Sequence, residues 1–197
     1  MNRVFFPRFF NAYHQDFPHI KIHLNYQDHN LLKQDLVKGK CDAIFTTQDD
    51  VDYDERLAFW PLIAGNFQVI LTPEHPLAKK EQLDYQDLTG QTLLLFSPNW
   101  CPPLQARLQK QLKEKCLQAE LIYVDNVAVA KTMLESNFGL AVMPSFIHCP
   151  KDSHLTTVPF NDTTPVTYGL ATLKHPQISL QDFTSWLNHH QKQFFHN

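Results

Sequence analysis

Short apolar segments of strand length alternate with amphipathic segments of helix length along most of this 197-residue chain. Apolar residues at helical spacing predict helices over residues 3–17, 30–38, 104–116, 127–136 and 180–195. Apolar runs, and apolar residues at every second position, predict strands over residues 19–26, 41–46, 57–63, 67–71, 91–96, 121–124, 140–143 and 164–173. Strands that alternate with helices are typical of an α/β fold with largely parallel sheets.

Composition and charge exclude several classes of protein. Hydrophobic residues make up 43% of the chain and 15 residues are Phe, which indicates a globular fold rather than disorder. The net charge of −3 argues against a surface that binds nucleic-acid phosphates, because such a surface needs clustered Lys and Arg. No apolar run approaches the length of about 18 residues that a membrane-spanning helix needs. Since Arg8, His14 and Asp16 also interrupt the apolar residues too early for a secretion signal, we expect a soluble, cytoplasmic protein without a membrane partner.

No pattern in the sequence indicates catalysis, a cofactor or a metal. His75 has no partner nearby in the sequence with which it could form a catalytic triad or a metal site. His189, His190 and His196 do not have a recognised ligand spacing, and a solvated helix end explains them more simply. We therefore expect a protein that is not an enzyme and that carries neither a cofactor nor a structural metal.

The four cysteines are scattered, and none of them forms a C-x-x-C pair. Cys41, Cys101, Cys116 and Cys149 are therefore expected to be free thiols in a reducing compartment. Cys101 precedes a predicted helix start, where a thiolate is favoured, but the spacing selects no partner for a redox pair.

Five short motifs follow one another along the chain. LTPEHPLAK (residues 71–79) stands directly behind the apolar segment FQVIL, and NFGLAVMPSF (137–146) follows the helix predicted over residues 127–136. PRFFNAYHQDFP (7–18), DLVKGKCDAI (35–44) and LDYQDL (83–88) are the other three. Taken in their order along the chain and at their spacing, the five motifs resemble the effector-binding domain of LysR-type transcriptional regulators over nearly the whole chain.

The resemblance implies an α/β, two-lobed fold of the periplasmic-binding-protein-like type 2 class. Each lobe would be a sheet flanked by helices, and two strands, residues 67–71 and 164–173, would cross the hinge. Lobe I would combine residues 1–70 with residues 167–197, and lobe II would be the inserted segment 71–166. His75 would have a structural role near the crossing between the lobes.

The chain departs from this family pattern at its N-terminal end. The family's DNA-binding winged helix-turn-helix and linker helix are not in the sequence, so contact with DNA would need a domain absent from this chain. The first strand of the effector domain, normally just ahead of Arg3, is missing as well. A shortened gene product, or another segment that fills the gap, would explain this departure.

Polar residues follow three predicted strands, where open α/β sheets bind ligands against helix N-termini. The resemblance implies that these loops line the cleft between the lobes and bind a small, anionic metabolite. The expected effector-binding residues are Thr46, Thr47, Ser97, Pro98, Asn99, Asn126, Met143 and Pro144. Capping of helix N-termini is the alternative role for Ser97 and Asn126. Asp125 would repel an anion and is therefore not included.

The first predicted helix carries more aromatic residues than one packed face needs. The resemblance implies that this helix contacts a partner subunit, so the expected dimer interface is Phe5, Phe6, Phe9, Phe10 and Tyr13. A wider core within the chain is the alternative explanation for the same pattern.

The function that the resemblance implies is effector sensing in a bacterial transcriptional regulator. The chain would bind a small metabolite without catalysis, and would form a homodimer, or a higher oligomer in a full-length protein. The alternative is a free-standing solute-binding protein of the same fold, which predicts an export signal and a monomer.

Overall fold

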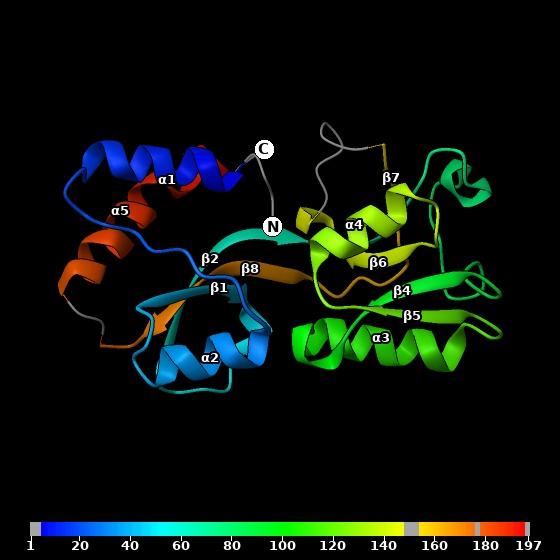
Figure 1. The fold of residues 1–197 in the computed structure, drawn as a ribbon, viewed down its shortest axis with the longest axis horizontal. Coiled ribbons are helices and arrows are strands. Elements are labelled where there is room, and N and C mark those ends of the chain that lie inside the picture. The colour runs from blue at the N-terminus through cyan, green and yellow to red at the C-terminus, as the bar shows by residue number, and fades with distance from the viewer. Residues whose placement is uncertain (1–4, 148–153, 176–177, 196–197) are drawn as a thin grey trace. The chain divides into compact units, whose positions relative to one another are not determined.

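The computed structural model describes residues 5–147, 154–175 and 178–195 (Figure 1). The helices are α1 (Phe5–Asp16), α2 (His29–Val37), α3 (Pro103–Lys115), α4 (Val127–Glu135) and α5 (Ile178–Phe195). The strands are β1 (Ala43–Thr47), β2 (Leu57–Gly65), β3 (Phe67–Leu71), β4 (Thr92–Phe96), β5 (Glu120–Val124), β6 (Ala141–Pro144), β7 (Thr156–Pro159) and β8 (Val166–Leu173). Helices and strands alternate, so the fold is α/β. Within the described ranges, no helix has both the length and the apolar character that a bilayer span requires.

The chain forms two compact units, which we call unit 1 (residues 1–63 and 167–197) and unit 2 (residues 64–166). Strand β3 lies inside unit 2, so the chain passes from one unit to the other within β2 and at the start of β8. The sequence instead places the first crossing at residues 67–71.

Unit 1 is a three-stranded sheet, in the order β1-β8-β2, with helices on both faces. Side chains alternate across β1, so that Phe45 packs with α1 and α5 while Ile44 packs with α2. On α1, Phe6, Phe9 and Tyr13 repeat at helical spacing and are buried. Helices α1 and α5 lie side by side and together cover one face of the sheet (Figure 1).

Unit 2 contains the sheet β6-β3-β7 and the parallel pair β4-β5. A bridge between Leu93 and Leu140 joins the two, with Leu94 N donating to Leu140 O at 2.8 Å. Helix α3 packs on one face of these strands through Leu108 and Leu112, and α4 packs on the other. Two core clusters therefore enclose the strands of this unit.

The sheets differ from the expectation of largely parallel pairing. Among the strand pairs whose registers are defined in the described residues, only β4-β5 is parallel, and β1-β8, β3-β6 and β3-β7 are antiparallel. Periodicity shows that a segment is a strand but carries no information about the direction of its neighbour. The expectation of largely parallel sheets is therefore wrong.

The prediction of a strand over residues 19–26 is also wrong. This segment has no regular secondary structure, and Ile22, Leu24 and Tyr26 are 41%, 64% and 57% exposed. A strand is stable only when a neighbour satisfies its backbone groups. None of the described residues forms a ladder with this segment, so the alternating pattern has no partner to pair with.

The structure assigns structural roles to the two most informative motifs. In NFGLAVMPSF, Asn137 follows Ser136, the C-cap of α4, with φ at +59°, and Ala141–Pro144 form the buried strand β6. In LTPEHPLAK, the Nδ1 of His75 accepts a hydrogen bond from the backbone N of Leu77 at 3.2 Å, at the start of a single 3₁₀ turn. His75 therefore caps a turn.

We expect Gly139→Ala to lower the free energy of unfolding by about 1–3 kcal/mol, because it overpacks a strand junction. A Cβ at this position would lie 2.6 Å from the carbonyl oxygen of Thr92, which also accepts the backbone N–H of Leu140. Gly39→Ala is the comparison, since Gly39 also has positive φ but a Cβ there would meet no atom within 4 Å. Urea denaturation of both variants checks this, and a smaller loss for Gly139→Ala than for Gly39→Ala would contradict it.

Candidate functional site

Thr46 and Thr47 end β1 and are both buried, with 0% and 4% exposure. The hydroxyl of Thr46 donates to Oδ2 of Asp50 at 2.9 Å and lies 3.3 Å from Nδ1 of His29. His29 and Lys33, both on α2, also approach Asp50, at 3.6 Å and 4.0 Å. Because its only proton is given to Asp50, the Thr46 hydroxyl can offer a ligand nothing but an acceptor.

This network holds the pKa of Asp50 below its usual value. Burial acts in the opposite direction, but hydrogen bonds from His29 and Thr46, with the charges of His29 and Lys33, outweigh it. A carboxylate with a lowered folded-state pKa stabilises the fold above its unfolded pKa, and this stability is lost as the pH falls through the folded-state pKa. The end of β1 is thus fixed to α2 by an ionised Asp50 near neutral pH.

We expect Asp50→Asn to lower the free energy of unfolding by about 1–3 kcal/mol near neutral pH, where the wild-type carboxylate is charged. The difference between the two proteins should begin to shrink as the pH falls below about 4, where the carboxyl of the unfolded chain becomes neutral. It should be lost once the pH is below the lowered pKa of Asp50 in the folded state. Denaturant unfolding at neutral and at acidic pH measures both differences. An equal difference at the two pH values would contradict the assigned role of this charge.

Thr47 differs from its neighbour because its buried hydroxyl has no hydrogen-bond partner among the described residues. Thr47 stands opposite Tyr168 in the β1-β8 register, so the two side chains share a face of the sheet. The Tyr168 ring stacks with Phe45 at a centroid distance of 6.4 Å, and burial, with a smaller effect of Tyr26, raises the pKa of Tyr168. A buried hydroxyl without a partner is costly, so a group that satisfies it would be favoured here.

A second polar group lies in unit 2, where the parallel strands β4 and β5 end together. The Ser97 hydroxyl donates to Oδ1 of Asp125 at 2.7 Å, and Asn126 Oδ1 accepts from the backbone N of Val129 at 2.9 Å. Asn126 is therefore the N-cap of α4, as the capping alternative predicts. The hydroxyl of Ser97 makes no cap bond. Pro98 and Asn99 are exposed next to it.

Met143 and Pro144 are buried at the end of β6. Met143 is 2% exposed and packs in the core cluster with Ile70, Leu94 and Phe96. Core packing alone accounts for the Met143 side chain.

The aromatic residues of α1 are largely used inside the chain. Phe9 and Tyr13 are 0% and 2% exposed in the core of unit 1, and Phe6 is 7% exposed. Phe10 is half-buried, and the side chain of Phe5 lies outside the described residues. A wider core within the chain, the alternative given above, accounts for the burial of Phe9 and Tyr13. Among the described aromatic residues of α1, Phe10 has exposed surface that a partner subunit could contact.

The cysteines that can be described are not activated thiols. Burial raises the pKa of Cys101 to about 12 and that of Cys116 to about 11, and it also raises the pKa of Cys41. A neutral thiol is a poor nucleophile, so burial argues against the redox hypothesis for Cys101. Cys149 lies outside the described residues.

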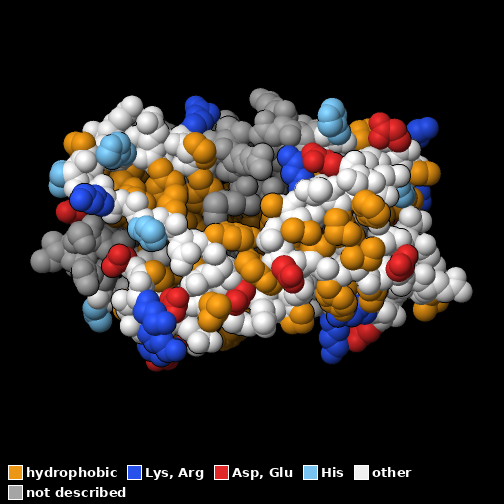
Figure 2. Space-filling model, viewed as in Figure 1, with side chains coloured by type: hydrophobic (Ala, Val, Ile, Leu, Met, Phe, Trp, Pro, Cys, Tyr) orange, Lys and Arg blue, Asp and Glu red, His pale blue; other side chains and the backbone are white. Residues whose placement is uncertain are grey.

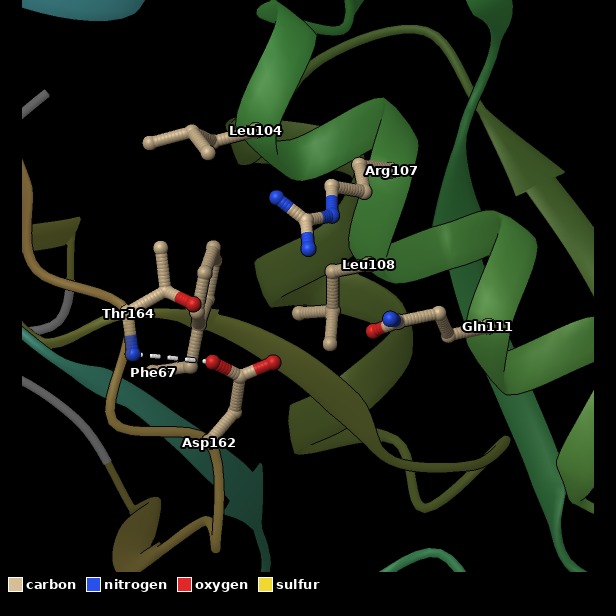
Figure 3. A pocket seen from close by; sticks show the side chains of 7 residues that line it. All are labelled: Phe67, Leu104, Arg107, Leu108, Gln111, Asp162 and Thr164. Carbon is tan, nitrogen blue, oxygen red and sulfur yellow. Dashed lines mark hydrogen bonds between the residues drawn. The ribbon is translucent and has the colours of Figure 1, made fainter.

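A pocket that the sequence did not predict opens in unit 2 (Figure 3). It is lined by Phe67, Leu104, Arg107, Leu108, Gln111, Asp162 and Thr164. None of the predicted effector-binding residues contributes to it. Arg107 and Gln111 are one turn apart on α3, but only the fold brings this helix face to Asp162.

Comparison with known proteins assigns the family. The family described as "LysR substrate binding domain" matches residues 1–192. The chain therefore belongs to this family and is an effector-binding regulatory domain of the LysR type, with a periplasmic-binding-protein-like type 2 fold. The domains of this family are regulatory and are not enzymes.

Curated relatives are longer than this chain. The transcriptional regulator MetR of Salmonella typhimurium is 28% identical over 115 residues, which are 57% of this chain and 34% of MetR. CysB of Haemophilus influenzae is 22% identical over 157 residues, 79% of this chain and 48% of CysB. The matches therefore span about a third to a half of these regulators.

Solved structures share the fold at low sequence identity. The CcmR regulatory domain of Synechocystis PCC6803, in complex with 2-PG, has a TM-score of 0.81 at 17% identity, covering 96% of this chain and 92% of that chain. The QuiR effector binding domain, in complex with shikimate, has a TM-score of 0.74 at 20% identity, covering 96% and 91%.

Proposed function

We propose that this chain is the effector-sensing part of a cytoplasmic, DNA-binding transcriptional regulator, and that it binds a small anionic metabolite without covalent chemistry. The observation that carries the proposal is the buried, unpartnered hydroxyl of Thr47 at the carboxyl end of β1. Strand ends are where α/β domains bind ligands, and this hydroxyl can donate to an anion. The small ligands of the CcmR and QuiR domains support the same class of effector.

Within unit 2, the ends of β4 and β5 offer a separate candidate site for an anion. The first backbone N–H groups of α4, at Val127 and Ala128, have no acceptor within the helix and favour negative charge. Asp125, whose exposed carboxylate accepts a hydrogen bond from Ser97, would repel an anion and is not part of the proposed site.

We further propose that the regulator is a homodimer and that it reaches DNA through a separate DNA-binding domain. On the face shown in Figure 2, Lys and Arg side chains lie in separate small groups and form no continuous basic patch among the described residues. Such a surface gives little affinity for nucleic-acid phosphates. The half-buried Phe10 on α1 supports a contact between subunits at this helix.

Thermal unfolding in the presence of small carboxylates tests the class of effector. Shikimate and a panel of metabolic carboxylates would be compared with the neutral amide of each compound. We expect a saturable rise in Tm for at least one acid and none for its amide, because binding to the native state stabilises it. Equal stabilisation by an acid and its amide would contradict an anionic effector.

A further inference from the structure

The sheet of unit 1 has two outer edges, and they differ in how they are protected (Figure 1). Strand β2 forms one edge and carries the exposed Pro61 in its middle, which has no N–H to offer a further strand. Strand β1 forms the other edge, and its sequence AIFTT contains neither proline nor charge. Natural sheets protect their free edges with such residues, so β1 is an edge that is open to pairing.

The backbone of β1 is only partly used. In its antiparallel pairing with β8, alternate residues direct their N–H and C=O groups away from β8. No described residue forms a ladder or a bridge with this outer side of β1. The side chains of Ile44, Thr46 and Thr47 are nevertheless buried. Strand β1 therefore has the side-chain burial of an interior strand and the open backbone of an edge strand.

Residues 21–25, which we call the arm, are held beside β1 at both ends. Just before the arm, Ile20 packs against the same core cluster as Phe45 of β1. Shortly after it, Nδ1 of His29 lies 3.3 Å from the hydroxyl of Thr46. Between these two anchors the arm has no regular secondary structure. The arm thus runs next to β1 without forming a ladder with it.

The sequence of the arm is nevertheless that of a strand. Its apolar residues, Ile22 and Leu24, are 41% and 64% exposed and alternate with polar residues. No described residue forms a ladder with the arm. Aliphatic side chains at alternate positions stabilise a sheet when a neighbouring strand packs against them. The arm therefore offers a second open strand edge next to that of β1.

The surroundings of β1 define what can pair with these two edges. Helices α1 and α5 cover one face of the sheet and α2 covers the other, so a strand added beside β1 would lie between helices (Figure 1). Strands that are covered on both faces are apolar on both faces. The described strands of this chain already pair with one another, and the stretches outside the described ranges contain no apolar run as long as β1. The chain itself therefore has no spare segment of this kind.

We propose that β1 and the arm form an acceptor for one further β-strand, an extended peptide segment that is apolar on both faces and comes from outside these 197 residues. The segment would match the five residues of β1 in length. Its backbone would pair with β1 on one side and with the arm on the other. Its side chains would cover Ile22 and Leu24. This interaction does not depend on the effector proposed above.

The test is hydrogen–deuterium exchange of the chain with a soluble peptide in which Lys pairs flank an alternating Val-Ile core as long as β1. We expect saturable binding and slower exchange of the amides of the arm and of alternate amides of β1. The control peptide has Pro at the centre of the same core and cannot complete a ladder. It should bind about tenfold more weakly or worse, because a backbone hydrogen bond is lost. No saturable binding, or equal binding of the two peptides, would overturn the proposal.

A variant of the arm locates the acceptor. Leu24→Lys should weaken binding of the Val-Ile peptide about tenfold or more, because the leucine that the added strand would cover is lost. Leu117→Lys is the matched control, since Leu117 is 68% exposed and lies in unit 2. Both leucines are exposed in the free chain, so unchanged urea denaturation shows that each variant is folded. Equal peptide affinity of the two variants would overturn the role of the arm.

A second copy of the chain is the alternative occupant. Two copies could pair only through their own open edges, so exchange of the β1 and arm amides would then slow as the chain concentration rises without peptide. We expect exchange of these amides to be independent of chain concentration. Protection that rises with chain concentration would assign the acceptor to a second copy and overturn the proposal.

Discussion

Phe9→Ala should lower the free energy of unfolding by about 3–5 kcal/mol, the cost typical of removing a large aromatic side chain from a packed core. Phe9 is fully buried and packs edge-to-face with Trp186 and Phe183, at centroid distances of 5.4 and 6.0 Å. It also contacts Phe45 on β1 at 6.3 Å. Removing this ring leaves a cavity between α1, α5 and the sheet of unit 1.

Denaturant unfolding at two protein concentrations measures this loss and separates it from a loss of dimer contacts. A core residue gives the same loss at both concentrations, whereas the effect of an interface residue depends on concentration. Phe138→Ala is the matched control, because Phe138 is 60% exposed. A loss below about 1 kcal/mol, the level of an ordinary surface change, or one that depends on concentration, would contradict the assignment of Phe9 to the core.

Thr47→Val should weaken binding of a responding carboxylate about tenfold or more, the effect of losing one hydrogen bond to a charged group. In the absence of ligand, the same variant should be as stable as the wild type or slightly more stable. The reason is that it removes a buried hydroxyl that has no partner among the described residues. The expected signature is thus a loss of binding without a loss of stability.

Thr46→Val serves as the control, because it is expected to lower the stability of the fold, which Thr47→Val is not. Its hydroxyl donates to Asp50, so the variant should lose about 1–3 kcal/mol of unfolding free energy. Calorimetric titration with the acid that raises Tm, together with denaturant unfolding of both variants, separates the two threonines. Unaltered affinity in Thr47→Val would remove Thr47 from the site.

The sequence predicted helices and strands best where the residues of a segment themselves indicate its structure. FQVIL is predicted as a strand over residues 67–71 and forms β3 over the same residues. The α/β class and the family follow from motifs whose residues make local contacts or turns, such as the cap that His75 forms with Leu77 and the positive φ of Asn137 after α4. Local chemistry of this kind is readable without knowledge of distant neighbours.

Properties that depend on distant residues were not readable. Apolar and polar residues alternate over residues 19–26 as they do in a half-buried strand, yet no described segment pairs with these residues. The aromatic stripe on α1 indicates burial but not the element that covers it, and α5 covers Phe9. The pocket in unit 2 brings together Phe67, Arg107 and Asp162, which the sequence separates widely. Side-chain polarity also could not distinguish Thr46, whose hydroxyl is engaged, from Thr47.

The most direct measurement for the effector-sensing proposal is native mass spectrometry of the purified chain and of Thr47→Val. This measurement reads subunit number and any retained small molecule together. The account predicts a dimer that carries a small mass released on denaturation, and a Thr47→Val dimer that carries much less of it. A wild-type monomer without a bound molecule, or equal retention in Thr47→Val, would contradict the account.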